Sequence, residues 1–579
     1  MEIPRVRPPR GWFPIPEYLK RSGEKFPDRM AVRIKRRKKW FGYTYGELVE
    51  KAARLAAFIR DQGLGKGDKI SVLGENRPEW ILSYFAIQWA GATVVPLDAK
   101  LKPPEYFHIL NDAEVSLIFV SGHKLPDIQE IRDRVPSLKK VIVMDDVNGE
   151  LTLEKVLDSY KEPAPLANIG LEDLAVILYT SGTTGTSKGV MLTHKNISSN
   201  VDGIYQIIDI NERDKSFSYL PLHHVFEATA GMIFPLSVGV QITLARSLKP
   251  TEMIEDLRET KPTLMTTVPL LLEKFLLRIR GELKKSPVKK GVVGVMKGLH
   301  KGLRPLLGRN RARKIFKSIL SKLGFEELRY MVSGGAALPP WVSRGLEELG
   351  FPILQGYGLS ETAPVLTVNP PCCPRNTSAG LPLPYVEIKI MDPDPEGVGE
   401  IAARGPNVMP GYYKNPQATK EVFTDDGWFL TGDVGYLDED GFLYITGRKK
   451  SVIVTAGGKN IFPEEVESVL LQSPFIEEVL VVRGANPITG AEEVQAIVYP
   501  NFEEVEAYFK EKGIENPTEK DIEALIGEEI SKYSAQLADY KKPKRFRLRD
   551  EEFPKTTTRK IKRYLFEEKS IPLIKEKKK

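Results

Sequence analysis

The stretch YTSGTTGTSKGV, residues 179–190, decides how this chain is interpreted. It follows the apolar run 174–179, whose length and β-branched residues predict a buried strand. Three glycines alternate with six Ser and Thr residues. Backbone N–H groups and hydroxyls can then surround phosphate oxygens, because glycine permits close approach and positive φ. Lys188 adds a mobile positive charge for the same oxygens, so the stretch predicts a phosphate-binding loop.

The common P-loop pattern does not fit this stretch. In that pattern Lys and Ser or Thr directly follow the second glycine and open a helix, whereas Lys188 is followed by Gly189. The alternative is a linker rich in Ser, Thr and Gly, and a twelve-residue match directly after a strand argues against it. The stretch closely resembles the phosphate-binding signature of the adenylate-forming superfamily, which includes acyl-CoA synthetases, peptide-synthetase adenylation domains and luciferases.

Five further stretches resemble the same superfamily, in its order, and together they span most of the chain. They are LPLHHVFE (220–227), SGGAAL (333–338), QGYGLSET (355–362), TGDVG (431–435) and PKTTTRKIKR (554–563). Alone, a Gly-rich turn such as SGGAAL is a weak signal, and an Asp in a turn is usually only a turn residue. The ordered series makes the resemblance specific.

Length and composition indicate a multidomain protein without disulfides. A chain of 579 residues exceeds the size of one core, and 41% hydrophobic with 28% charged residues is typical of a globular protein. The two cysteines, Cys372 and Cys373, are adjacent, which gives neither a disulfide framework nor a metal-ligand spacing. Without a signal peptide or a spanning helix, we expect a cytoplasmic protein that is soluble or lies on the inner face of a membrane.

Alternating helical and strand patterns predict the fold class. Helical runs at 45–60 and 80–89 alternate with strand runs at 69–73, 92–96 and 117–120, which is typical of an α/β domain with mainly parallel sheets. A second such run follows the phosphate-binding stretch. We therefore expect α/β subdomains over about 1–378, built on two mainly parallel sheets.

Two further regions complete the expected organisation. Short strands separated by Gly/Pro turns predict a small β-subdomain over about 379–447, which closes an N-terminal domain of residues 1–447. From residue 448 to 579 a helix at 463–471 and strands at 478–482 and 494–499 predict a smaller α+β domain. The resemblance implies that this C-terminal domain is mobile.

The resemblance also implies a nucleotide site. Tyr357 would stack on adenine and Ser360 would contact the α-phosphate. Glu361 would bind Mg²⁺ with the Thr183 hydroxyl, and one carboxylate suffices because Mg²⁺ combines few carboxylates with phosphate oxygens. Asp433 and Arg448 would contact the ribose. The other nucleotide-binding residues that the resemblance implies are Thr180, Ser181, Gly182, Thr184, Gly185, Lys188, Gly334, Gly335, Ala336, Gln355, Gly356 and Gly358.

Two residues carry the implied catalysis. Lys560 matches the superfamily's closing lysine, which neutralises the carboxylate and the α-phosphate in the transition state, although Arg559 stands where a glycine is usual. A basic surface run is the alternative. His224 matches a histidine between the acyl pocket and the nucleotide, and a structural histidine is its alternative. Residues 227–229, Glu-Ala-Thr, stand where many long-chain members carry an aromatic gate.

The same resemblance places a hinge at Lys450, where the sequence pattern changes. Between the two half-reactions the C-terminal domain would rotate about it, because hinges absorb backbone rotation in a few residues. The rotation would present Lys560 for adenylation and another face for thioester formation. On that second face, Gly457 and Gly458 would let a coenzyme A tunnel form.

A basic insert, residues 278–322, carries fifteen Lys and Arg residues and one acid. Apolar residues form two stripes at helical spacing: Val292, Val295, Met296, Leu299, Leu303, Leu306 and Leu307, then Ile315, Phe316, Ile319, Leu320 and Leu323. A basic amphipathic helix is typical of a membrane-surface element, and the alternative is that the stripes face a protein core. No nucleic-acid motif accompanies the charge. An insert here is typical of long-chain acyl-CoA synthetases.

Taken with the resemblance, these features predict a long-chain fatty acid–CoA ligase that uses ATP, Mg²⁺ and coenzyme A and takes part in fatty acid metabolism. The alternatives are a ligase for a medium-chain or aryl acid, a carrier-protein thiol as acceptor, and a non-catalytic nucleotide-binding protein at the membrane. A homodimer is plausible by resemblance.

Overall fold

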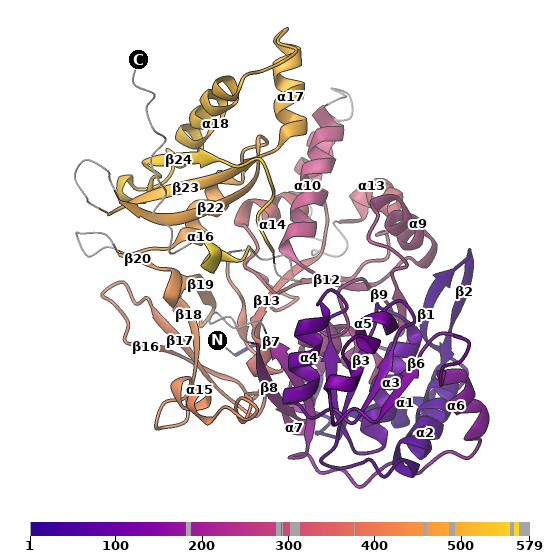
Figure 1. Cartoon of the computed structure of the whole chain (residues 1–579). Coiled ribbons are helices and arrows are strands. Elements are labelled where there is room, and N and C mark those ends of the chain that lie inside the picture. Colours follow the sequence, from indigo (N-terminus) through magenta and orange to yellow (C-terminus); the bar gives the residue numbers. More distant parts are fainter. Residues whose placement is uncertain are drawn as a thin grey trace. The chain divides into compact units, whose positions relative to one another are not determined.

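The computed structural model describes residues 2–180, 187–284, 291, 293–301, 313–375, 377–454, 460–485, 492–555 and 561–566. The chain divides into two compact units (Figure 1). The first unit comprises Met1–Lys389, Ala402–Phe429 and Asp438–Leu443. The second comprises Ile390–Ile401, Leu430–Leu437 and Tyr444–Lys579.

One sheet of the first unit ends in the predicted phosphate-binding region. It has six strands, in the order β6 (Lys140–Val143), β5 (Leu117–Val120), β3 (Lys69–Leu73), β4 (Thr93–Leu97), β7 (Leu174–Thr180) and β8 (Lys188–Thr193). All neighbours are parallel except β7 and β8, which form an antiparallel hairpin. This hairpin brackets the glycine-rich stretch.

A second sheet in the same unit has nine strands. Their order is β15 (Leu381–Pro382), β14 (Val365–Val368), β13 (Ile353–Gly358), β12 (Tyr330–Ser333), β11 (Leu264–Thr267), β9 (Lys215–Ser218), β10 (Gln241–Leu244), β1 (Met30–Arg36) and β2 (Lys39–Thr44). The pairing is parallel from β13 to β1 and antiparallel at both ends. The prediction of two mainly parallel α/β sheets is confirmed.

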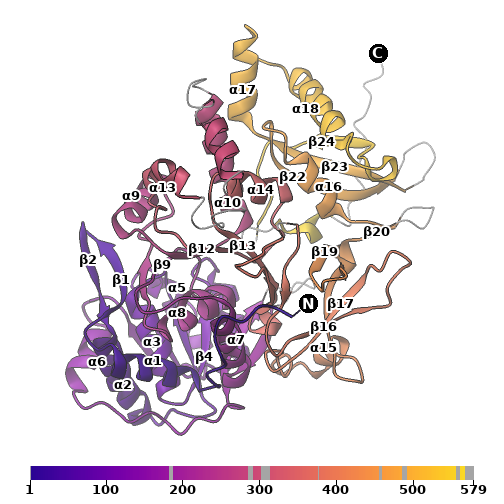
Figure 2. The same ribbon diagram turned by 180° about the vertical axis from the view of Figure 1, so that it is seen from behind.

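Helices connect and cover these strands. Figure 2 shows α1 (Ile15–Lys25), α2 (Tyr45–Asp61) and α3 (Pro78–Trp89) close together in the N-terminal part of the unit. Thr44 caps α2, since its hydroxyl accepts the Glu47 N–H and the Glu47 carboxylate accepts the Thr44 N–H. The other helices of this unit are α4 (Pro103–Asp112), α5 (Leu125–Gln129), α6 (Leu153–Ser159), α7 (His194–Ile207), α8 (Phe234–Leu236), α9 (Pro250–Thr260), α10 (Pro269–Lys284), α13 (Lys317–Leu323), α14 (Pro340–Glu347) and α15 (Pro416–Glu421).

Short strands follow, as predicted for residues 379–447. Strands β16 (Glu387–Met391), β17 (Gly399–Arg404), β18 (Phe429–Leu437) and β19 (Leu443–Arg448) form a four-stranded sheet in that order. The second unit then holds the pair β20 (Ile453–Val454) and β21 (Asn460–Ile461) and a sheet of β22 (Ile476–Ala485), β23 (Glu492–Pro500) and β24 (Arg545–Leu548). Its helices are α16 (Pro463–Leu470), α17 (Phe502–Glu511) and α18 (Glu519–Ser534). The smaller C-terminal α+β fold is confirmed, while the boundary at 447/448 stays a prediction.

The described part of the basic insert packs mostly on the protein core. Phe316 and Leu320 are buried, and Ile319 and Leu323 pack against the same cluster. Helix α13 then ends at Gly324, whose φ of +81° closes the helix. The second apolar stripe therefore faces a protein core, the alternative to a membrane-facing stripe.

The first apolar stripe of the insert is divided in the structure. Val293, Met296 and His300 contact the core at i, i+3 and i+7 spacing. Val295 and Leu299 instead lie at the surface, 64% and 52% exposed. The prediction that Val295, Met296 and Leu299 share one buried face is wrong, because the core-facing side is set by Val293 and His300.

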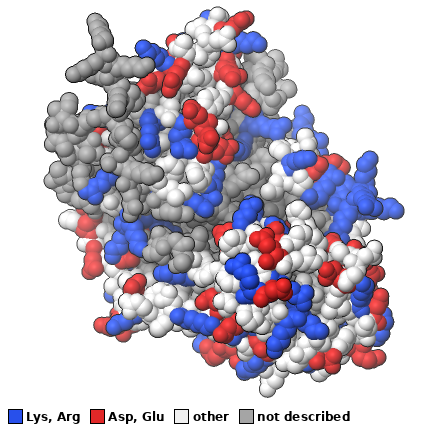
Figure 3. Space-filling view, in the orientation of Figure 1, with Lys and Arg blue, Asp and Glu red and all other residues white. Residues whose placement is uncertain are grey.

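Basic side chains also gather at the turn between β1 and β2. Arg37, Lys38 and Lys39 are exposed there, and Figure 3 shows Lys and Arg at the edge of the first unit where this hairpin projects in Figure 1. Within the described residues, no helix is long and apolar enough to cross a membrane.

Replacing Phe316 with Ala tests the packing of the insert. The ring is fully buried, so its loss is expected to destabilise the first unit by about 3–5 kcal/mol through lost burial and a cavity. Val295→Ala is the matched control and is expected to change stability by less than about 0.5 kcal/mol. Thermal melting of both variants checks the assignment, and equal losses in the two would contradict it.

Candidate active site

Neighbouring strand ends bring two of the predicted motifs together. Ser333 at the end of β12 pairs in parallel register with Gln355 of β13, so SGGAAL and QGYGLSET leave the same edge of the nine-stranded sheet. The Gly334 N–H donates to the Thr267 carbonyl at 3.1 Å, which adds the end of β11 to this edge. Ligands of open α/β sheets bind beyond the carboxyl ends of such strands.

Two of these glycines are required by their surroundings. A Cβ on Gly358 would lie 1.8 Å from the Pro364 carbonyl oxygen, so no side chain fits there. Gly335 has a φ of +82°, a conformation that L side chains rarely adopt. The remaining predicted residues of the two motifs, Ala336, Gly356, Tyr357 and Ser360, lie in the same two connections.

Tyr412 joins the phosphate-side hairpin to the predicted metal ligand. Its hydroxyl donates to Glu361 Oε1 at 2.9 Å, and Lys188 Nζ lies 5.3 Å from its ring centroid. Burial, and then Glu361, raise the pKa of Tyr412, so it stays a donor. Lys188 in turn pairs with Thr180 across β7 and β8. The predicted residues Thr180, Lys188 and Glu361 thus converge on one side chain.

The backbone around Tyr412 is fixed from several sides. Val190 and Tyr412 form a β-bridge, and the Met409 N–H donates to the Glu361 carbonyl at 2.8 Å. Asn196 on the first turn of α7 donates to the carbonyls of Pro406 and Val408 at 2.8 and 2.9 Å. Helix α7, whose N-terminus is capped by Thr193, therefore holds the loop that carries Tyr412.

In the second unit, the two predicted ribose contacts are paired. Arg448 Nε lies 2.7 Å from Asp433 Oδ1, and the Asp433 side chain is buried while the arginine is half exposed. The Asp433 N–H donates to Thr431 Oγ1 at 3.1 Å. A carboxylate fixed in this way is oriented before a hydroxyl ligand arrives. The predicted hinge residue Lys450 lies in the short turn Lys449–Ser451 directly after β19.

The two histidines of LPLHHVFE differ in environment. Their ring centroids are 4.2 Å apart. His223 is buried, and burial followed by the Lys100 charge lowers its pKa to about 3. Its Nε2 lies 3.6 Å from Asp98 Oδ2, beyond hydrogen-bond distance. His223 is therefore a neutral core residue, whereas the predicted site residue His224 is only partly buried.

Asn76 fixes the start of this segment. It donates to the Leu220 carbonyl at 2.6 Å and accepts the Leu222 N–H at 3.0 Å.

Two family models match this chain. The model described as AMP-binding enzyme matches residues 19–413, and the model described as AMP-binding enzyme C-terminal domain matches residues 465–560. The first covers more than half of the chain and includes the Tyr412 cluster and both strand-end motifs. The chain belongs to the AMP-binding enzyme family.

Individual relatives of this AMP-binding enzyme differ in their acids. The long-chain-fatty-acid–CoA ligase of Bacillus subtilis is 31% identical over 95% of this chain and 93% of its own length. The indoleacetate–CoA ligase of Aromatoleum aromaticum is 29% identical over 84% of this chain and 88% of its own length. Among solved structures, ATP-bound MatB from Rhodopseudomonas palustris superposes with a TM-score of 0.74 at 27% identity and covers 95% of this chain and 98% of its own.

Several predicted residues of this AMP-binding enzyme lie outside the described residues, and their roles stay predictions. They are Ser181, Gly182, Thr183, Thr184, Gly185, Gly457, Gly458 and Lys560.

The described residues fit a Mg²⁺ site that is completed by phosphate oxygens. Among them, no group of three or more His, Cys, Asp or Glu side chains gathers around a point, as expected for an ion held by one protein carboxylate. In the part of the chain that the structure describes, Glu361 forms no ion pair with Lys or Arg, and one of its oxygens accepts from Tyr412. Glu361 can therefore offer its other oxygen to a metal ion.

Sequence reasoning missed Tyr412 and gave Glu227 no role beyond a missing gate. Glu227 is fully buried at the start of a π-helix, Glu227–Ile233, a geometry frequent at functional sites. Its carboxyl accepts from Ser218 Oγ and Thr266 Oγ1, both at 2.5 Å. Burial raises the pKa of Glu227 to about 7. A Gly-Tyr-Tyr run and a single Glu give no sequence signal for these contacts.

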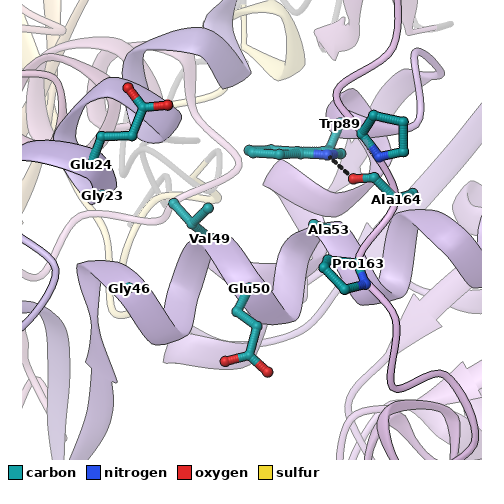
Figure 4. Close-up of a pocket in the computed structure, with 10 residues that line it drawn as sticks. Gly23, Glu24, Gly46, Val49, Glu50, Ala53, Trp89, Pro163 and Ala164 are labelled. Atoms are coloured by element: carbon teal, nitrogen blue, oxygen red, sulfur yellow. Dashed lines mark hydrogen bonds between the residues drawn. The ribbon is translucent and has the colours of Figure 1, made fainter.

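A separate groove of about 530 Å³ lies in the first unit. Figure 4 shows Val49, Trp89 and Pro163 along it, with Glu24 and Glu50 nearby. Trp89 Nε1 donates to the Ala164 carbonyl at 3.0 Å (Figure 4). None of the predicted site residues lines this groove, so it is unrelated to the candidate active site.

Replacing Tyr412 with Phe tests whether its hydroxyl orients Glu361. Without this donor the carboxylate loses its fixed rotamer, and the Mg²⁺ concentration for half-maximal ATP binding is expected to rise about tenfold. Calorimetric titration of ATP at several Mg²⁺ concentrations measures it. Tyr413→Phe removes the neighbouring hydroxyl and is expected to leave the Mg²⁺ dependence unchanged, and equal effects in the two variants would refute the assignment.

The raised pKa of Glu227 predicts a pH-dependent effect on stability. Above pH 7 folding must bury the ionised carboxylate, and this cost disappears as both states become protonated towards pH 4. Glu227→Gln is therefore expected to gain about 2–3 kcal/mol more stability relative to wild type at pH 8 than at pH 5. Melting temperatures at both pH values measure the difference. The exposed Glu130, replaced by Gln, serves as control, and a pH-independent difference for Glu227→Gln would be contrary to expectation.

Proposed function

We propose that this AMP-forming acid–CoA ligase activates long-chain fatty acids. The support is the likeness to the Bacillus subtilis long-chain-fatty-acid–CoA ligase, which extends over nearly the whole of both chains, together with the basic insert before SGGAAL. The enzyme uses ATP and Mg²⁺, with coenzyme A as a substrate. The fatty carboxylate attacks the α-phosphorus of ATP, which gives acyl-AMP and pyrophosphate, and the coenzyme A thiol then displaces AMP.

In this proposal the protein supplies position and charge rather than a nucleophile. Two anions must meet, so the residues at the site hold phosphate oxygens and compensate their charge. Lys188 supplies a cation at the end of the hairpin and the amides beyond β12 and β13 supply donors. Asp433 would hold the ribose hydroxyls, with Arg448 beside it. When bound, Mg²⁺ would neutralise charge on the phosphates.

Further parts of the proposal rest on the resemblance alone. Residues 448–579 would rotate about Lys450 between the half-reactions, with Lys560 entering for adenylation and Gly457 and Gly458 lining the coenzyme A path. The insert 278–322 would contact the inner membrane surface, where Val295 and Leu299 are exposed. A cytoplasmic homodimer belongs to the same proposal.

A second candidate substrate is an aryl acid. The indoleacetate–CoA ligase relative favours it, and so does the ring of Phe226, because a Cβ on Gly334 would lie 3.0 Å from its Cζ. An aromatic ring against this glycine narrows the region next to the strand ends. A medium-chain acid, a carrier-protein thiol as acceptor, or a nucleotide-binding role without turnover are separated from these by the assay below.

Acid-dependent pyrophosphate release tests the proposal. Palmitate is expected to support release and, with coenzyme A, palmitoyl-CoA formation, while octanoate, benzoate and indoleacetate react more slowly. Lys560→Ala is expected to lose about two to three orders of magnitude in adenylation rate, because an electrostatic contact to the transition state is lost. Lys562→Ala, two residues on, is the control and is expected to remain active.

Each other outcome points elsewhere. Faster release with indoleacetate would replace the long-chain assignment by the aryl one. Release without acyl-CoA formation would indicate a different thiol acceptor. ATP binding without release for any acid would overturn the catalytic proposal.

A further inference from the structure

The carboxyl group of Glu227 occupies a seat built from three separate segments. Ser218 is the last residue of β9 and Thr266 lies in the neighbouring parallel strand β11, and each hydroxyl donates to one carboxyl oxygen at 2.5 Å. The third side is Gly231 on the same π-helix, where an added Cβ would lie 2.5 Å from the Glu227 carboxyl carbon. Any side chain at position 231 would displace the carboxyl.

This arrangement is unfavourable for stability alone. A buried carboxylate without a cation costs several kcal/mol or takes up a proton. Among the described residues, hydroxyl groups and not Lys, Arg or His hold this carboxyl. An apolar side chain of similar size would avoid that cost, so the polar contacts must do something that packing does not.

The carboxyl is directly connected to the substrate side of the segment. Glu227 lies three residues after His224, and the Ala228 N–H donates to the His224 carbonyl at 2.8 Å. Phe226, its immediate neighbour, places its ring against Gly334 at the end of β12. The bonds to β9 and β11 therefore fix the turn from which both side chains project.

We propose that Glu227 is a positioning residue for the acid substrate: its carboxyl ties the π-helical turn to β9 and β11 and so sets where His224 and Phe226 stand. This inference rests on the proposed acid–CoA ligase function of the same site. The Glu227 carboxyl itself takes no part in the chemistry. It acts through the segment, and its loss affects the acid more than the nucleotide.

Four variants test the proposal by steady-state kinetics, with the acid of the panel that wild type uses fastest. Glu227→Ala removes both hydrogen bonds and Gly231→Ala displaces the carboxyl. Each is expected to lower kcat/KM for the acid by about tenfold or more, with KM for ATP within about twofold of wild type, because a small displacement near the reacting groups is costly. Glu227→Gln keeps one acceptor and gains one donor for the two hydroxyls, and is expected to stay within about threefold of wild type.

The double variant Glu227→Ala/Gly231→Ala distinguishes the seat from a general packing defect. If Gly231 serves the carboxyl, its replacement adds little once the carboxyl is gone, so the double variant is expected to match Glu227→Ala within about threefold. Additive losses would overturn the proposal, as would a parallel rise in KM for ATP, a Glu227→Gln variant as poor as Glu227→Ala, or unchanged kinetics in Glu227→Ala.

If Glu227→Ala does not fold, Ser218→Ala and Thr266→Val carry the test, since each removes one donor and little volume. A lower kcat/KM for the acid with unchanged KM for ATP supports the proposal, and unchanged kinetics in both variants overturns it. Because wild type is measured with every acid, a wrong long-chain assignment changes only the acid used. Absence of turnover in wild type would be a failure of the proposed function itself.

Discussion

Parallel strand pairing is the constraint on which the candidate site depends. In a parallel sheet every strand ends at the same edge, so β9, β11, β12 and β13 deliver residues that are far apart in sequence to one line. Ser333 opposite Gln355 is the closest expression of this. The glycines that follow belong to the same constraint, since the chain must turn at once without a side chain: Gly358 has no room for a Cβ and Gly335 needs positive φ.

Hydroxyl groups connect the parts that backbone pairing leaves separate. Tyr412 links Glu361 to the hairpin that carries Lys188, and Ser218 with Thr266 links the segment after His224 to the sheet. In both places a carboxyl accepts from a hydroxyl rather than from a cation. Such bonds fix the direction of a carboxyl without neutralising it, so Glu361 keeps its charge for a metal ion.

Much of the fold could be predicted because its signals are local. The strand at 69–73 and the helix that starts at Tyr45 were placed from apolar spacing and an N-cap, and the structure has β3 at Lys69–Leu73 and α2 at Tyr45–Asp61. The residues that bind in the family came from motif resemblance, and the structure brings Thr180, Lys188 and Glu361 to one tyrosine. Tyr412 itself could not be predicted, because its contact with Glu361 spans 51 residues and depends on how two loops meet. The buried face of residues 293–301 was misjudged for a similar reason: several faces of a basic helix carry apolar residues, and only the neighbouring core selects one.

Glu227 shows why the sequence pattern is least informative where function is expected. Local rules favour an apolar residue at a buried position behind a sheet edge, and this chain has a glutamate whose pKa is raised to about 7 by burial. Sequences generally satisfy propensity, pattern and polar pairing together, and the exceptions concentrate at sites under another constraint. The glycine four residues later, which leaves space for that carboxyl, indicates that the exception is accommodated by the surrounding structure. A side chain that weakens the fold while two strands and its own helix are shaped around it is best understood as holding its neighbours in place.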